Sequence, residues 1–186
     1  MTEAAPTPAE SAGEKKLAAL LLDAGIAVRA HRHKPLFTVE ESRAEIAALP
    51  GAHTKNLFLK DRKGALTLVS CLDHRRIRIA DLEKAIGARR LSFAPPPLLE
   101  EALGVAPGSV TPFALINDSA RRVRLILDAG MMAREPLNFH PLHNKATFAI
   151  SAAGFRAFLA RIGREAEEVD FDALERLAAA REEKTG

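Results

Sequence analysis

The sequence lacks several residues on which common protein chemistries depend. Its 186 residues include no Trp, no Tyr and a single Cys, Cys71. One Cys cannot form an internal disulfide or a Cys-rich zinc site, and Phe is left as the only aromatic ring for stacking on bases. No run of about 18 apolar residues is present that would span a membrane. The acidic, Pro- and Ala-rich start does not have the order of a signal peptide, so we expect a cytoplasmic protein without a membrane partner.

The overall composition is that of an ordinary globular protein, with 47% hydrophobic and 27% charged residues. A chain of this length suits one domain, which buries roughly 70% of its unfolded surface. Residues 1–13 are Pro-interrupted and without periodicity, and are predicted to be a disordered extension. Residues 14–171 are predicted to form the domain, and residues 172–186 a C-terminal helix and tail.

Positive charge is concentrated in one part of a nearly neutral chain. The formal net charge is +3, yet residues 29–90 contain 14 Lys and Arg against 7 Asp and Glu. The excess lies in three clusters, at residues 29–34, 74–78 and 88–90. Such clusters suit a polyanionic partner through charge steering and phosphate contacts, although a solvated surface produces the same pattern.

Hydrophobic periodicity predicts helices that alternate irregularly with strands. Helices are expected over residues 14–25, 38–49, 81–87, 97–104, 151–163 and 172–183. Strands are expected over residues 26–33, 54–60, 65–72, 91–94, 113–116, 123–127 and 146–150, with a hairpin turn at 61–64. Adjacent strands linked by hairpins favour an α/β (α+β) fold: a single compact domain with one mixed, largely antiparallel sheet flanked by helices.

Several familiar catalytic arrangements are missing or weak. There is no nucleophile elbow, P-loop or dinucleotide glycine fingerprint. His140 and His143 are three residues apart, but Pro141 disfavours a helix that would align their rings, so we expect no metal site. A single His in a cleft, as a pocket wall or hydrogen-bond donor, suits His140 better. Cys71 and His74 could form a thiol–imidazole pair, yet Cys71 ends an apolar run where a buried, inert Cys is usual.

Two segments remain as candidates for binding. Residues 108–112, Gly-Ser-Val-Thr-Pro, contain a Gly and a Pro that fix a loop whose peptide groups can line a cleft, although a rigid turn before a strand has the same composition. Lys55 and Lys60 point to opposite faces of one predicted strand because side chains alternate. Lys55 shares its face with Leu57 and Leu59, where a buried cation needs an anionic partner unless it snorkels at the strand end.

Four segments occur in an order that is more specific than any one of them: 53–61 (HTKNLFLKD), 90–94 (RLSFA), 103–113 (LGV, then GSVTPF) and 138–141 (NFHP). Together they resemble the YbaK/ProX superfamily of trans-editing aminoacyl-tRNA deacylases, and most closely its freestanding ProX branch of prolyl-tRNA editing proteins. The resemblance runs from about residue 14 to residue 163. It implies a mixed-sheet fold with a cleft between sheet and helices, and no cofactor.

The resemblance also implies roles for particular residues. Lys55 and His140 would be catalytic, Lys55 by positioning the 3′ end of the tRNA and His140 on the pocket wall. Lys60 would be a further basic contact to the substrate. The loop would hold the aminoacyl group and water with its backbone; it comprises Gly108, Ser109, Val110, Thr111 and Pro112. Phosphates of the acceptor stem would be contacted by basic residues, namely Arg75, Arg76, Arg89 and Arg90.

The expected activity is therefore hydrolysis of the ester bond of mischarged aminoacyl-tRNA, with alanine on the tRNA for proline as substrate. Its partners would be mischarged tRNA and a prolyl-tRNA synthetase. An aminoacyl ester is already activated, so positioned water, fixed dipoles and the substrate's own ribose 2′-hydroxyl can suffice. The alternatives are a deacylase of the cysteinyl-tRNA branch that removes Cys from tRNA for proline, a non-catalytic nucleic-acid-binding module, or a structural domain that acts through a synthetase.

Overall fold

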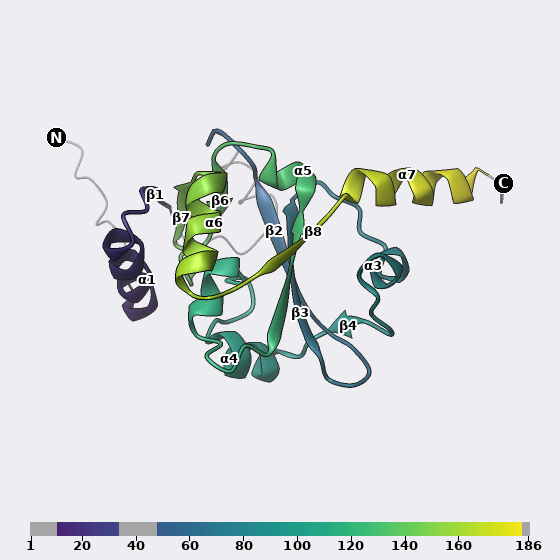
Figure 1. The fold of residues 1–186 in the computed structure, drawn as a ribbon, viewed down its shortest axis with the longest axis horizontal. Helices are drawn as coiled ribbons and strands as arrows, with labels where there is room; N and C mark the ends of the chain where they lie inside the picture. The colour runs from purple at the N-terminus through teal and green to yellow at the C-terminus, as the bar shows by residue number, and fades with distance from the viewer. Residues whose placement is uncertain (1–10, 34–47, 184–186) are drawn as a thin grey trace.

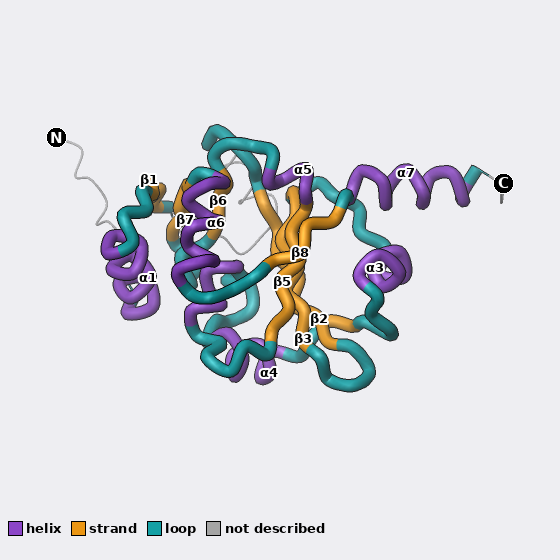
Figure 2. The backbone as a smooth tube through the Cα atoms, viewed as in Figure 1, coloured by secondary structure: helices purple, strands orange, loops and turns teal. Residues whose placement is uncertain are grey.

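The strands of this chain divide into two sheets. The computed structural model describes residues 11–33 and 48–183, and in this part a five-stranded sheet lies beside a three-stranded one (Figures 1 and 2). The predicted class, mixed helix and strand in one domain with helices against the sheets, is confirmed. One expectation changes: a single sheet was predicted, whereas the chain forms a mixed sheet and a separate antiparallel sheet.

The five-stranded sheet begins with the predicted hairpin. Strands β2 (Thr54–Lys60) and β3 (Leu66–Leu72) are antiparallel along their whole length. The short strand β4 (Ser92–Phe93) pairs with the end of β2, opposite Leu59 and Lys60 only. In the described part of the chain, the first residues of β2 therefore form an edge of this sheet.

The other side of the sheet is parallel. Strand β5 (Val123–Asp128) lies parallel to β3, and β8 (Ala166–Val169) lies parallel to β5, which completes the order β4-β2-β3-β5-β8. Parallel neighbours need crossover connections, and helices supply them here. As a result β3 is central and buried along both faces.

The three-stranded sheet is antiparallel and has the order β1-β7-β6. Its strands are β1 (Val28–Arg32), β6 (Leu137–Phe139) and β7 (Ala146–Ile150). It joins the larger sheet just before β2, where Ala52 bridges to Leu137 and the Ala52 N–H donates to the Pro136 carbonyl at 2.8 Å. This junction brings the start of β2 beside β6.

Helices pack around both sheets and lie at both ends of the molecule (Figure 1). Serine hydroxyls cap two of them: Ser11 accepts from the Glu14 N–H, and Ser151 from the Gly154 N–H. The C-terminal helix projects at the end of the molecule opposite the N-terminal one (Figure 1). The described helices are α1 (Ala12–Asp23), α3 (Ile79–Ile86), α4 (Pro96–Leu103), the short α5 (Ala129–Met132), α6 (Ala152–Arg161) and α7 (Phe171–Glu182).

Side-chain alternation along β2 feeds two hydrophobic clusters, one on each face of the larger sheet. Leu59 packs in the smaller cluster with Leu82 of α3 and Phe171 of α7. Phe58 belongs to the larger cluster, which fills the space between the two sheets and is centred on Phe113. The Phe113 ring lies edge-on to four other Phe rings, with centroid distances of 5.1–6.4 Å. Such aromatic packing fixes the segments on either side of Phe113.

Most predicted elements are present, and the exceptions have physical reasons. Residues 113–116 were predicted to be a strand but belong to a 3-10 helix, η1 (Pro112–Ile116), because Pro112 starts it and the Thr111 hydroxyl accepts the Phe113 N–H. The predicted helix 38–49 lies almost entirely outside the described residues. Strands β6 and β8 and helix α5 were not predicted, because each has only three or four residues, too few to show a period.

Candidate functional site

The start of β2 is hydrogen-bonded to β6, which His140 directly follows. The Thr54 hydroxyl donates to the Asn138 carbonyl at 2.6 Å. The buried Asn138 side chain in turn donates to the carbonyls of Pro50 and Ala52, at 3.0 and 3.1 Å. These bonds join the chain on both sides of Ala52 to β6. They therefore hold Lys55 and His140, each one or two residues away, in one region.

The 108–112 loop is anchored to the same part of β2. The Asn56 amide donates to the Val110 carbonyl at 2.9 Å, and the Ser70 hydroxyl donates to the Asn56 side-chain oxygen. On its other side the loop runs into Phe113, whose ring centroid lies 5.6 Å from that of Phe139, the neighbour of His140. The loop is thus fixed between β2 and β6.

The loop has the backbone that the sequence predicts for it. Gly108 has a φ of +83°, in the left-handed region that favours glycine, and no heavy atom lies within 4 Å of where its Cβ would be. Ser109 and Thr111 are buried, and the Ser109 N–H donates to the Ala106 carbonyl at 3.0 Å. A rigid loop with an open Gly is a geometry in which backbone groups can approach a ligand closely.

Lys55 is half-buried on the opposite face of β2 from Asn56. It lies directly across from Cys71 of β3, and its ammonium group donates to the backbone carbonyl of Arg75. The anionic partner expected for a lysine on this face is replaced by a neutral carbonyl. Because Lys55 lies on the edge of the sheet, its long side chain can reach either this carbonyl or a ligand beyond the edge.

His140 is a neutral imidazole at pH 7. Burial lowers its pKa, and the neighbouring rings of His33 and His143 lower the pKa further, against a hydrogen bond to the Ala146 carbonyl that favours the charged form. Nδ1 lies 3.2 Å from that carbonyl oxygen, so the neutral ring donates from Nδ1. Its Nε2 then carries a lone pair, and His140 offers a ligand an acceptor and not the donor that the sequence suggested.

The segment that carries His140 is clamped by the N-terminal helix. His143 Nε2 lies 2.6 Å from a carboxylate oxygen of the buried Glu14, which also forms an ion pair with Arg32 at 2.6 Å. Burial opposes ionisation of Glu14, but the hydrogen bonds from Arg32 and His143 outweigh it and hold the pKa of Glu14 below its usual value. Glu14 is therefore charged at neutral pH and fixes the segment through His143.

Three polar residues of this region were not among the sequence candidates. Asn56 and Thr54 flank Lys55 and make the bonds that join the three segments. His33, at the end of β1, is buried, with its ring centroid 6.4 Å from that of His140 and its Nε2 3.1 Å from the Thr147 hydroxyl. The available signal was a polar Asn at a core-facing position of β2, on the same side as Phe58.

Lys60 lies at the far end of β2 from Lys55, five residues or about 16 Å along the strand. There it is opposite Ser92 of β4, close to the two arginines that precede that strand. The Arg62 N–H donates to the Arg89 carbonyl at 3.5 Å, which places the hairpin turn beside Arg89 and Arg90. We call this set the basic strip; it consists of Lys60, Arg62, Lys63, Arg89 and Arg90.

Arg75 does not fit its predicted role as an RNA contact. It is 4% exposed, and its guanidinium group pairs with three carboxylates: Asp128 at 2.8 Å, Glu175 at 3.0 Å, and Asp172. With four of its five N–H donors used in this way and its side chain buried, it joins the end of β5 to α7 and is not available to a phosphate. Arg76 is exposed, and its backbone N–H donates to Glu175 at 2.9 Å.

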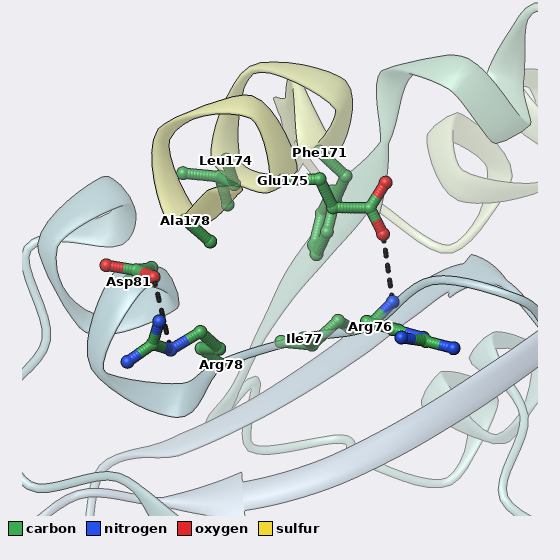
Figure 3. A pocket seen from close by; sticks show the side chains of 8 residues that line it. All are labelled: Arg76, Ile77, Arg78, Asp81, Phe171, Leu174, Glu175 and Ala178. Atoms are coloured by element: carbon green, nitrogen blue, oxygen red, sulfur yellow. Dashed lines mark hydrogen bonds and ion pairs between the residues drawn. The ribbon is translucent and has the colours of Figure 1, made fainter. Parts of the chain in front are cut away.

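A shallow groove between α3 and α7 lies next to Arg76 (Figure 3). Phe171, Leu174 and Ala178 of α7 form one wall, and Ile77 lies opposite (Figure 3). Its lining includes neither Lys55 nor the 108–112 loop nor His140. The groove lining therefore contains none of these three, although Arg76 adjoins Arg75, whose carbonyl accepts from Lys55.

Among the described residues there is neither a reactive cysteine nor a cluster of metal ligands. Burial raises the pKa of the Cys71 thiol to about 12, so the thiol stays protonated and unreactive at neutral pH. Within residues 11–33 and 48–183, no group of three His, Cys, Asp or Glu side chains is placed to hold a metal ion. None of the described helices is long and apolar enough to cross a membrane.

Several proteins are similar in sequence to this chain over most of its length. A prolyl-tRNA synthetase associated domain-containing protein 1 from Bos taurus is 37% identical over 164 residues, which cover 86% of this chain and 93% of the relative. The prolyl-tRNA editing protein ProX of Acetoanaerobium sticklandii is 32% identical over 120 residues, which cover 64% of this chain and 73% of that protein.

The fold and a family profile agree with these relatives. A solved structure named as a candidate trans-editing enzyme for prolyl tRNA synthetase matches with a TM-score of 0.66 at 19% identity, over 87% of this chain and 98% of that one. At that identity the match shows a shared fold. The profile of the aminoacyl-tRNA editing domain matches residues 33–158. The resemblance to YbaK/ProX-type proteins is thereby confirmed, and this chain belongs to the aminoacyl-tRNA editing domain family.

Proposed function

We propose that this protein hydrolyses the ester bond of alanine mischarged onto the tRNA for proline. The observation that carries the proposal is that the start of β2, which bears Lys55, is bonded to the 108–112 loop through Asn56 and to β6, which precedes His140, through Thr54, in a member of an editing family. The names of the relatives, which refer to prolyl-tRNA synthetase and prolyl-tRNA editing, support proline tRNA as the carrier.

The chemistry requires positioning more than a strong nucleophile. An aminoacyl ester is activated, and a rigid loop whose peptide dipoles face the ester can orient water and stabilise the developing oxyanion. The Asn56 bond to the Val110 carbonyl keeps the loop in place before the substrate arrives. The route uses no side-chain nucleophile, which agrees with the protonated state of Cys71.

Lys55 and His140 have complementary roles in this proposal. Lys55 exchanges its bond to a neutral carbonyl for a bond to a phosphate at the 3′ end, because a charge-assisted hydrogen bond is the stronger of the two. The lone pair on Nε2 of the neutral His140 accepts a hydrogen bond from the ribose 2′-hydroxyl or from the attacking water. Both residues act on the substrate directly, so both are catalytic.

Selection of alanine is a matter of size. A synthetase pocket built for proline rejects a smaller amino acid poorly, since a missing methylene changes binding by only about 1–3 kcal/mol. A second, smaller pocket does the opposite: it admits alanine and excludes proline by steric clash. We propose that the 108–112 loop forms the wall of that pocket, and that the protein works beside a prolyl-tRNA synthetase.

The test is deacylation of purified tRNA for proline charged separately with Ala, Cys, Ser and Pro. We expect rapid loss of alanine and no loss of proline. Preference for Cys would place the protein with the cysteinyl-tRNA deacylases, and RNA binding with a steep salt dependence but no hydrolysis would make it a binding module. Release of alanine no faster than in buffer would contradict the proposal.

The pH dependence of deacylation tests the role of His140. Because its pKa is lowered, His140 keeps its lone pair down through pH 7 and loses it only below the usual histidine value of about 6.5. We expect kcat, corrected for spontaneous hydrolysis, to fall only on that acid side. The variant His140→Gln should lower kcat and remove the acid limb, whereas His74→Gln, at an exposed histidine, should keep it. An unchanged limb in His140→Gln would show that another group titrates.

A further inference from the structure

One aromatic side chain of the described residues is strongly exposed. Phe93 in β4 is 65% exposed, while Leu22 and Leu177 are the other large hydrophobic side chains found exposed there. A single exposed apolar residue is common and by itself implies nothing. The surroundings of Phe93 and its position relative to Lys55 distinguish it from the two leucines.

The backbone around Phe93 holds the ring at the surface. Phe93 is paired with Leu59 of β2, and the N–H of the next residue, Ala94, donates to the Phe58 carbonyl at 3.0 Å. Two residues before the ring, the buried Leu91 is held by its N–H, which donates to Glu83 at 2.6 Å. Pro95 directly follows Ala94. The ring is therefore presented on a rigid segment and loses little freedom when a ligand covers it.

The basic strip lies on both sides of this segment. Arg89 and Arg90 precede β4, and Lys60 is opposite Ser92. Asp61 is the only acidic residue of the hairpin turn, and its carboxylate accepts the N–H groups of Lys63 and Ala65 at 2.7 and 2.8 Å. Lys60 points to the other face of the sheet from the ring, so the cations beside the ring are those that flank the strand, in the hairpin turn and at Arg89 and Arg90. An exposed ring beside cations suits a base attached to phosphates, because a base stacks on the ring while the cations contact the backbone. An apolar protein surface would find charges where it needs apolar contact.

Phe93 and Lys55 lie on the same face of the sheet. Residues directly opposite in an antiparallel pair share a face, so Phe93 is on the face of Leu59, and Lys55 is on that face four residues earlier in β2. The separation along the strand is about 13 Å, or about four base steps at roughly 3.4 Å each. This span matches the short unpaired 3′ end of a tRNA whose terminal ribose is held near Lys55. Because Leu57 and Leu59 pack beneath α3 and α7, that end would follow the edge of β2 and not the covered face.

We propose that Phe93 is a substrate-positioning contact that stacks on an unpaired base of the tRNA 3′ end, where that end leaves the acceptor stem. The inference rests on the proposed function, because it takes the substrate to be a tRNA with its 3′ terminus at Lys55. Stacking is tolerant of the base, so Phe93 contributes affinity and register, and the 108–112 loop keeps the selection of the amino acid.

The test uses two RNA hairpins with the acceptor stem of proline tRNA, one with the unpaired 3′ end and one blunt. We expect Phe93→Ala to bind the first hairpin roughly 10-fold more weakly than the unchanged protein, and the blunt hairpin equally well. Phe93→Trp should keep the affinity, and Leu177→Ala, at another exposed apolar residue, should not alter it. With 2-aminopurine in the unpaired end, the protein should quench its fluorescence, and Phe93→Ala should lose that quenching.

Several results would overturn the inference. Equal affinity of Phe93→Ala for the hairpin with the unpaired end would do so, as would the same loss on both hairpins. Normal RNA binding by Phe93→Ala together with loss of binding to a prolyl-tRNA synthetase would assign the ring to a protein partner. Failure of the proposed function can be distinguished from failure of this inference. If no ester is hydrolysed but binding depends on Phe93, the stacking contact stands, and if hydrolysis is normal in Phe93→Ala at all RNA concentrations, only this inference fails.

Discussion

Replacement of Lys55 by alanine is expected to remove most of the deacylation activity and to leave the protein folded. The folded state loses one hydrogen bond, from the half-buried ammonium group to the Arg75 carbonyl, worth about 1 kcal/mol. The reaction loses the cation that holds the 3′ end in register with the loop. Loss of one such preorganised electrostatic contact lowers kcat by roughly 100-fold or more. Single-turnover deacylation of Ala-tRNA measures the effect.

Two further variants separate the contact from general charge. Lys55→Arg keeps the positive charge but changes its reach and shape, so it should recover only part of the activity. Lys15→Ala removes an exposed lysine from α1, far along the chain from the site, and should leave activity unchanged. Full activity in a folded Lys55→Ala protein would remove Lys55 from the catalytic machinery and leave the loop and His140 to be tested alone.

Replacement of Arg75 by alanine is expected to cause a large loss of stability, about 3–5 kcal/mol. Asp128 is fully buried, and Arg75 is the cation that compensates its charge, with Nε 2.8 Å from the carboxylate. The same guanidinium group ties down Asp172 and Glu175 of α7. Its removal leaves a buried carboxylate without a counter-charge and releases the first turns of α7. Gly130 allows this arrangement, since a Cβ there would lie 2.6 Å from an Arg75 nitrogen.

Urea unfolding followed by far-UV circular dichroism measures the loss, because a protein without Trp and Tyr has little intrinsic fluorescence to follow. The control is Arg76→Ala at the adjacent exposed arginine, which contacts Glu175 through its backbone N–H and should change stability by no more than about 0.5 kcal/mol. If Arg75→Ala were as stable as Arg76→Ala but bound RNA more weakly, Arg75 would be an RNA contact as the sequence first suggested.

The arginines of the basic clusters show how far the sequence alone can predict RNA contacts. Charge counting finds the basic clusters of residues 74–78 and 88–90, but it treats every arginine as equally available. Arg75 is taken by Asp128, Asp172 and Glu175, the last two from a helix about 100 residues later in the chain. Arg89 and Arg90 are exposed beside the hairpin turn. Which cations remain for RNA depends on long-range pairing, which no local pattern contains.

The candidate site likewise has some features that the local sequence predicts and others that only the folded chain shows. The Gly–Pro spacing of the 108–112 loop and the alternation along β2 are local properties, so the loop and the face of Lys55 could be predicted from the residues. The bonds from Asn56 to Val110 and from Thr54 to Asn138 span 54 and 84 residues, and only the folded chain shows them. His140 was a candidate by resemblance, but its neutral state and its acceptor nitrogen follow from burial and from the Ala146 carbonyl.

The sequence by itself determined the chemistry that is available, the helix and strand periods, and the family to which the ordered motifs belong. These follow from residue types and short spacings, which act over a few residues. The tertiary structure decided that the strands form two sheets joined at Ala52 and that Arg75 supports the fold. Each of these depends on burial and on contacts between distant segments, because a charge or a strand edge acquires its role only from what the folded chain places against it.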